Sequence, residues 1–225
     1  MRYFGYGIGF SEQHKELGRI IRDKDRFEEA KQMFLSFHSS LNFEADKLLK
    51  ELAPQEWTIM PTVKDETIAW SIWHITRIED LTVGILVGGD RQIFDQQQKE
   101  KLNVAIVDTG NALSDDEIMN LSESINIHSL LDYRAAVIKR TQNIVRELST
   151  NDMRRKVSPD GIEKIRAEGG VTAQEESVWL LDYWGKKDVA GILLMPPTRH
   201  TLIHLNDCER WKEHISAGKK VFRTN

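Results

Sequence analysis

The sequence lacks the features that mark several classes of protein. Its 225 residues include a single cysteine, Cys208, so no disulfide can form within the chain. The longest apolar runs, such as VAGILLM at 189–195, are far shorter than the roughly 20 residues that a membrane-spanning helix needs. The first ten residues carry one basic residue and no long apolar stretch, which is not typical of a secretory signal. These absences favour a cytoplasmic protein that does not cross a membrane.

An excess of positive charge is also missing. Lysine and arginine total 31 against 35 acidic residues, which gives a net charge of −4. No basic field is therefore available to hold a phosphate backbone, and nucleic acid is not an expected partner. What the chain does contain is 40% hydrophobic and 29% charged residues, a composition typical of a globular protein that can bury a core.

Apolar residues recur at helical spacing in four long segments of the sequence. Pro54 ends the first segment, the GGD stretch at 88–90 ends the second, and Gly218 ends the fourth. No alternating strand pattern competes with this period. The sequence therefore predicts an all-α protein, a four-helix bundle with long inter-helix connections that carry short extra helices. The long helices are expected at about 24–52, 65–86, 126–148 and 197–216.

The connections between these helices contain weaker helical signals. Residues 90–113 lack a sustained period and are expected to hold one short helix, after which Ser114 and Glu117 form a capping box. A charge-dense loop with a small helix is expected at 149–170, and short helical pieces at 175–195.

The domain organisation follows from this pattern. We expect one domain over residues 1–225, with the bundle core at about 24–216 and an N-terminal extension at 1–23.

A pair of histidines stands near the start of the fourth helix, in PPTRHTLIHLNDCERW at 196–211. His200 and His204 are separated by four residues, so one face of the helix carries both imidazoles. This spacing permits a metal site, a catalytic pair or two histidines that merely share a face. Which of these roles applies depends on whether another helix brings a further side chain to the two histidines.

His74 in the second helix is such a group. In AWSIWHITRIEDL it lies in line with Trp70 and Ile78, on the side expected to face the core. A neutral imidazole in that position needs a hydrogen-bond partner or a metal.

The stretches SIWHITRIEDL and MPPTRHTLIHLND resemble those of the DinB-like (YfiT-related) superfamily. The resemblance covers about residues 27–215, although the segments 90–125 and 149–195 are longer here than in compact members. It implies a four-helix bundle in which His74, His200 and His204 bind a metal ion. It also implies activities of the kind known in the family, which include thiol-dependent S-transferases and a maleylpyruvate isomerase that use bacillithiol or mycothiol.

Three neutral imidazoles suit zinc, nickel or another late divalent ion and leave a coordination position open. Our leading hypothesis is a metal-dependent thiol S-transferase that acts on a small electrophile. A non-catalytic metal-binding or stress-related bundle and a metal-dependent hydrolase are the alternatives. The expected partners of the protein are a small thiol or electrophile. A second copy of the chain, packed through helix faces in a homodimer, is also expected.

Other residues near these motifs are not expected to belong to the site. RHTLIH lacks the glutamate of HExxH, so a zincin-type peptidase is excluded. Cys208 lies two turns beyond His200, about 12 Å along the axis, and is expected to be a small buried residue outside the site. Residues expected to lie at the surface or in the core, without a metal, are His14, His38, His128 and His214.

Charged and aromatic residues near the three histidines have expected secondary roles. Arg77 and Arg199 are expected on solvated helix flanks, from which either could hold an anionic group of a substrate. Trp70 and Trp73 are expected to fill the core or to line a pocket beside His74. Candidates to accept a hydrogen bond from a site imidazole are Glu79, Asp80 and Asp207.

Overall fold

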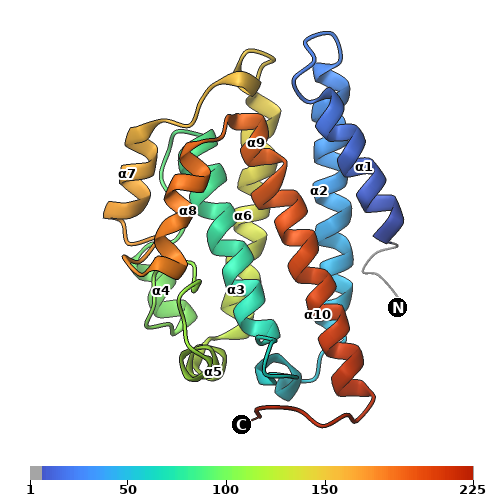
Figure 1. Ribbon diagram of the computed structural model, residues 1–225, viewed down its shortest axis with the longest axis vertical. Coiled ribbons are helices and arrows are strands. Elements are labelled where there is room, and N and C mark those ends of the chain that lie inside the picture. Colours follow the sequence, from blue (N-terminus) through green and yellow to red (C-terminus); the bar gives the residue numbers. More distant parts are fainter. Residues whose placement is uncertain (1–6, 225) are drawn as a thin grey trace.

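The computed structural model describes residues 7–224, and it confirms the all-α prediction. Two isolated bridges, Met60 with Arg223 and Lys156 with Asp188, are the nearest approach to a strand in these residues. Figure 1 shows four long helices running roughly side by side. They are α2 (Phe27–Lys50), α3 (Ile68–Glu79) with its continuation η2 (Asp80–Val87), α6 (Ile127–Glu147), and η4 (Met195–His200) with its continuation α10 (Thr201–Ser216).

Shorter elements fill the long connections. The predicted short helix in 90–113 is present as α4, and the pieces predicted in 149–170 and 175–195 are present as α7, α8 and α9. In Figure 1, α4, α7 and α8 lie on the side of α3 that is opposite α10, whereas α9 leads into η4. The shorter elements are α1 (Gly7–Ile20), η1 (Pro54–Thr58), α4 (Gln96–Leu102), α5 (Asp115–Ser124), η3 (Asp152–Arg154), α7 (Pro159–Ala167), α8 (Glu175–Gly185) and α9 (Val189–Leu193).

Side-chain caps fix several helix boundaries where the sequence places them. Ser114 and Glu117 form the predicted capping box at the start of α5. The Asn126 side chain accepts a hydrogen bond from the backbone of Ser129 and caps α6. Gly89 adopts a positive φ of 68°, the left-handed stop that the GGD stretch predicts after η2.

The α3–η2 helix is buried on all sides, whereas the sequence predicts an amphipathic helix with one apolar face. Every residue from Ile68 to Val87 is buried, including the charged side chains of Arg77, Glu79 and Asp80. The helix is central because α6, α10, α9 and α7 all pack around it. Its polar side chains therefore need partners within the protein.

The N-terminal extension forms a helix that the sequence analysis did not predict. α1 packs on α2, and it buries Leu17 and Ile20. The His14 imidazole donates a hydrogen bond to the Leu194 carbonyl at 2.7 Å, just before η4. Residues 1–6 of the expected extension, which begin the stretch examined for a secretory signal, lie outside the described residues. The single-domain organisation over 1–225 stays a prediction.

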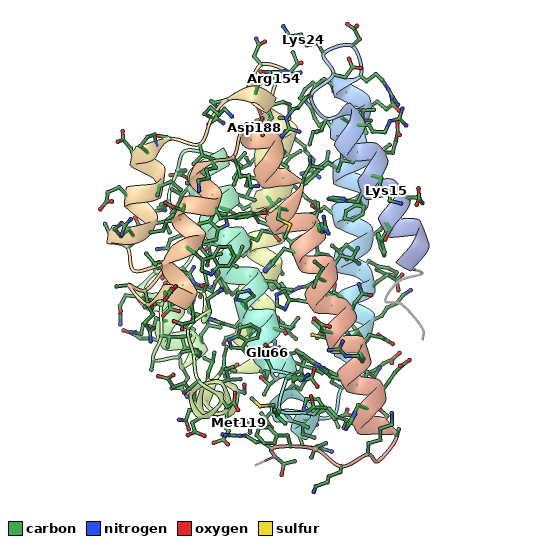
Figure 2. All side chains as sticks on the ribbon, viewed as in Figure 1. Lys15, Lys24, Glu66, Met119, Arg154 and Asp188 are labelled. Carbon is green, nitrogen blue, oxygen red and sulfur yellow. The ribbon has the colours of Figure 1, made fainter. Side chains whose placement is uncertain are left out.

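Charged side chains gather at the periphery of the bundle, as Figure 2 shows for Lys15, Lys24 and Arg154. Within residues 7–224, none of the helices combines the length and the apolar character needed to cross a bilayer.

Candidate metal centre

His74 lies in the middle of α3 with 3% of its surface exposed. The helix begins at Thr67, whose hydroxyl accepts a hydrogen bond from the backbone of Trp70 and caps the first turn. The Nδ1 atom of His74 lies 2.8 Å from the carbonyl oxygen of Thr109. A carbonyl only accepts, so Nδ1 carries the proton and Nε2 carries the lone pair.

His200 and His204 come from the junction between η4 and α10. The η4 segment contains Pro196 and has the wider π-helical turn, and two threonine hydroxyls bind its neighbouring carbonyls. Thr198 donates to the Leu193 carbonyl at 2.9 Å, and Thr201 donates to the Pro196 carbonyl at 3.0 Å. The backbone that carries the histidine pair is thereby held in place despite the missing proline donors.

The three imidazoles converge, as the sequence predicts for a common site. Each offers a nitrogen, and these three nitrogens all lie within 4.8 Å of one another. His74 Nε2 and His200 Nε2 are 3.2 Å apart, and the ring centroids are separated by 4.6–5.0 Å. A tetrahedral zinc ion with bonds of 2.0–2.1 Å places two nitrogen ligands about 3.3 Å apart, so the spacing of His74 and His200 fits such an ion.

The site favours neutral imidazoles. Burial lowers the pKa of His74 from 6.5 to about 4, although the hydrogen bond to Thr109 acts in the opposite direction. Burial and the nearby His74 lower the pKa of His204 to about 3. Burial, followed by repulsion from the other two rings, also lowers the pKa of His200 well below 6.5. At pH 7 all three rings therefore present lone pairs, the form that binds a metal.

Two ring nitrogens in this cluster lack a hydrogen-bond partner. They are the buried Nδ1 atoms of His200 and His204, which contact no donor or acceptor among residues 7–224. Buried polar atoms are nearly always paired, but on His200 the unpaired Nδ1 is not the nitrogen that faces His74, which is Nε2. Three neutral imidazoles, each with a nitrogen lone pair, could hold a divalent transition metal.

Comparison with known families identifies a family of helical bundles that matches the middle of the chain. A family model described as the DinB superfamily matches residues 44–178, which is more than half of the chain. The chain belongs to the DinB superfamily. The matched residues include His74, whereas His200 and His204 lie beyond them. A search of curated proteins found no match.

Cys208 lies outside the histidine cluster of this DinB-superfamily protein, as expected from its position on α10. Its side chain is fully buried, and burial raises the pKa of the thiol to about 12. A thiol of that kind is protonated at neutral pH and unavailable as a nucleophile.

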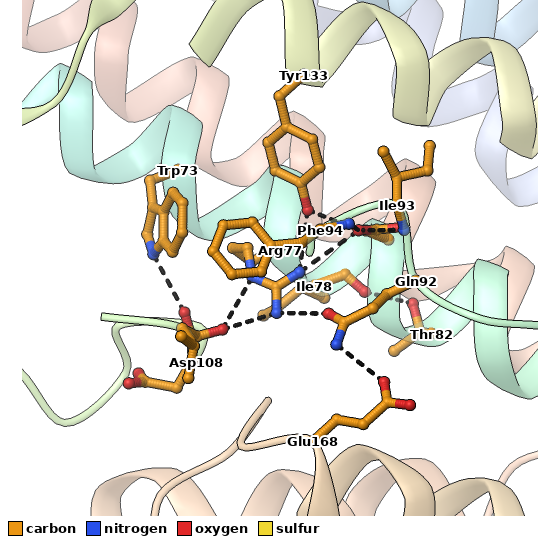
Figure 3. A network of polar contacts seen from close by, with 12 residues as sticks. Trp73, Arg77, Ile78, Thr82, Gln92, Ile93, Phe94, Asp108, Tyr133 and Glu168 are labelled. Carbon is orange, nitrogen blue, oxygen red and sulfur yellow. Dashed lines mark hydrogen bonds and ion pairs between the residues drawn. The ribbon is translucent and has the colours of Figure 1, made fainter. Parts of the chain in front are cut away.

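The expectation for Arg77 is wrong. Its side chain is fully buried and its donors bind groups of the protein, so it is not free to hold an anionic group of a substrate. Its guanidinium donates to the carbonyl of Val107 and to the hydroxyl of Tyr133 at 3.0 Å (Figure 3). Arg199 is exposed on η4, in agreement with the expected solvated flank.

The hydrogen-bond acceptor of the His74 imidazole is also different from the three carboxylates expected from the sequence. Glu79 binds His38 at 3.0 Å, Asp80 binds Tyr133 at 2.7 Å, and Asp207 pairs with Arg210 at 3.1 Å. The group that accepts the hydrogen bond from His74 is the backbone carbonyl of Thr109. Its only signal in the sequence is the turn chemistry of the DTGN stretch.

The other histidines and the two tryptophans take separate positions. His38 is buried against Glu79, and His128 is exposed on α6. His214 donates to the Lys220 carbonyl at 2.9 Å. Trp70 stacks on the His74 ring at 4.6 Å and walls the site, whereas Trp73 is buried beside Phe94.

Proposed function

We propose that this protein binds one late divalent ion, zinc or nickel, through His74, His200 and His204, and that it is a thiol-dependent S-transferase acting on a small electrophile. The observation that carries the proposal is the convergence of three neutral imidazoles, each of which offers one nitrogen within 4.8 Å of the other two. Membership of the DinB superfamily supports it.

The ligand set is open and carries no charge. A divalent ion bound there supplies a Lewis acid that lowers the pKa of a water or thiol at its free position. The residues of the chain contribute the geometry: α3 holds one ligand, and α10 with η4 holds the other two. Trp70 covers one face of His74 and limits the access of water to that ring.

The nucleophile has to come from outside the chain. Cys208 is the only cysteine, it is buried, and burial raises the pKa of its thiol to about 12. A thiol that reacts at the ion is therefore a cosubstrate and not a side chain of the protein. We favour a small thiol because the activities that the sequence resemblance implies use one, and such reagents are found in the cytoplasm, where we place the protein. A homodimer stays a prediction, which light scattering on the purified protein can test.

Titration calorimetry separates this proposal from its alternatives. Bacillithiol, glutathione and a simple monothiol are titrated into the zinc-loaded and metal-free protein. We expect at least one thiol to bind the loaded form more tightly, with affinity rising with pH until the bound thiol is ionised. The His204→Ala variant treated with the same zinc is the control. Equal affinities for loaded and metal-free protein would leave a hydrolase or a non-catalytic metal-binding bundle.

A cobalt-substituted sample gives an independent signal. Cobalt absorption reports on the ligands of the ion, so a thiol that enters the free position changes the spectrum. We expect that change on addition of the thiol that calorimetry selects. A spectrum that no thiol alters would argue against the transferase.

A further inference from the structure

Four side chains on one face of α3 bind a single turn of the chain. They stand at relative positions i, i+3, i+4 and i+7, which form one stripe of a helix. Each donates to a backbone carbonyl of the segment 107–110, which we call the DTG turn, so that the turn lies along this stripe. The bonds are Trp70 Nε1 to Gly110 O at 3.0 Å, His74 Nδ1 to Thr109 O at 2.8 Å, Trp73 Nε1 to Asp108 O at 3.2 Å, and Arg77 Nη2 to Val107 O at 2.7 Å.

The DTG turn has its own internal support. A carboxylate oxygen of Asp108 accepts a hydrogen bond from the backbone of Gly110 at 2.7 Å. Gly110 has a φ of +75°, a conformation that favours glycine, and a Cβ there would lie 2.9 Å from Trp70 Nε1. The Thr109 backbone donates in turn to the Gly170 carbonyl at 3.2 Å. The turn is therefore shaped by contacts that do not involve His74.

The Arg77 end of the stripe is anchored as well. Arg77 is held by Tyr133 at 3.0 Å and by Gln92 at 2.8 Å, and both of its bonds to Val107 originate from this fixed guanidinium (Figure 3). Trp73 points toward the Asp108 backbone in the same view. The carbonyl of Thr109 thus lies between anchored neighbours on both sides.

This arrangement decides which nitrogen of His74 is free. A neutral imidazole carries one N–H, and the Thr109 carbonyl can be satisfied only by a donor. Nδ1 then holds the proton, and Nε2 faces His200 Nε2 at 3.2 Å. With the opposite tautomer, the carbonyl would lose its donor and Nε2 would have no lone pair for a ligand.

We propose that the DTG turn positions the metal centre by fixing the tautomer and orientation of His74, and that Asp108 is the positioning residue that keeps the turn in shape. The inference rests on the proposed metal site. It assigns a role in that site to a residue that does not contact the ion.

Three variants test the role of Asp108. Asp108→Ala removes the acceptor for the Gly110 backbone, whereas Asp108→Asn removes the charge and keeps an acceptor oxygen. Asp95→Ala is the matched control, since Asp95 accepts a similar bond from the Gln98 backbone at 2.8 Å in α4. Zinc affinity is measured by competition with a chelator. We expect a loss of about 10–100-fold for Asp108→Ala, and affinities close to wild type for the other two variants. An affinity of folded Asp108→Ala equal to wild type would overturn the proposal.

Nitrogen NMR of the metal-free protein provides a second readout. Long-range proton–nitrogen correlations identify which ring nitrogen of His74 carries the proton. We expect the Nδ1–H form in wild type and in Asp108→Asn, and a mixture of the two forms in Asp108→Ala. An Nε2–H form in wild type would contradict the inference, even where Asp108→Ala does not fold. Failure of the wild type to bind zinc would instead remove the proposed function, and the tautomer measurement would still stand.

Discussion

Two buried polar clusters share the α3–η2 helix, and they differ in how completely their groups are paired. Around Arg77 and Asp80, hydrogen bonds fill the available positions: Asp80 accepts from Tyr133 at 2.7 Å and from the backbones of Ile93 and Phe94. Around His74, one nitrogen binds a carbonyl, whereas the Nδ1 atoms of His200 and His204 have no partner among residues 7–224.

The difference separates a structural cluster from a candidate ligand site. A buried charge is tolerated when it is paired and fully hydrogen-bonded, so the Arg77 cluster is complete without any added group. Unpaired nitrogens buried together are costly unless something binds them. The Arg77 cluster thus holds the fold, and the histidine cluster is the candidate ligand site.

Arg77→Met should produce the largest change in stability. The substitution leaves Asp80 buried without its cation and removes the donors to Val107, and breaking a buried pair typically costs about 3–5 kcal/mol. Urea unfolding in the presence of a chelator measures the change. Arg140→Met is the control, since Arg140 pairs with the exposed Asp90 and should cost at most about 1 kcal/mol. Similar losses for both variants would remove the distinction between the clusters.

Acid should destabilise the metal-free protein through the histidine cluster. The unfolded chain binds protons on histidine near pH 6.5, whereas burial lowers the pKa of folded His74 to about 4. The contribution of His74 to the free energy of unfolding is therefore complete above pH 6.5. It is lost as the pH falls toward 4, by about 3 kcal/mol. Urea midpoints across this range, compared with those of His74→Gln, measure the effect. Equal pH dependence in both proteins would contradict the prediction.

His204→Ala should abolish most metal binding with little effect on folding. One of three ligands is lost, but the apolar faces of the helices remain, so the free energy of unfolding without metal should change by only about 1 kcal/mol. Zinc competition and circular dichroism test the two parts. Global unfolding of the metal-free wild type at room temperature would indicate instead that the ion is structural.

Cys208→Ala should have the smallest effect on the metal centre. Cys208 lies one turn beyond His204 on α10, but it is buried away from the three nitrogens. The zinc affinity of this variant should equal that of wild type, which makes it the matched control for His204→Ala. A loss of affinity comparable to that of His204→Ala would make the cysteine a ligand.

Much of the fold was accessible from local sequence signals. The periodic helices, the Ser114 capping box and the stop at Gly89 are properties of short stretches, and the structure confirms them. The convergence of His74 with His200 followed from helix faces and a resemblance. The helix α1 carries only a short local signal, the apolar residues Leu17, Ile20 and Ile21 at helical spacing, and these are buried against the bundle.

The remaining features depend on partners that are distant in the chain. The burial of Arg77 and Asp80 requires Tyr133, more than 50 residues away, which no local pattern around α3 reveals. The acceptor for His74 is a backbone carbonyl, and every residue type has one. The π-helical turns η2 and η4 likewise have no sequence signature at the level of periodicity.

The separation of the ligands along the chain orders their arrival during synthesis. His74 and Thr109 are 35 residues apart, so a ribosome adding 5–20 residues per second supplies the carbonyl roughly 2–7 s after the imidazole. His200 follows His74 by 126 residues and arrives roughly 6–25 s later. The turn that sets the proton on His74 is therefore made well before either of the other two histidines. Assembly of the three-histidine cluster waits for α10, so an ion held by all three side chains would bind only after most of the chain has been made.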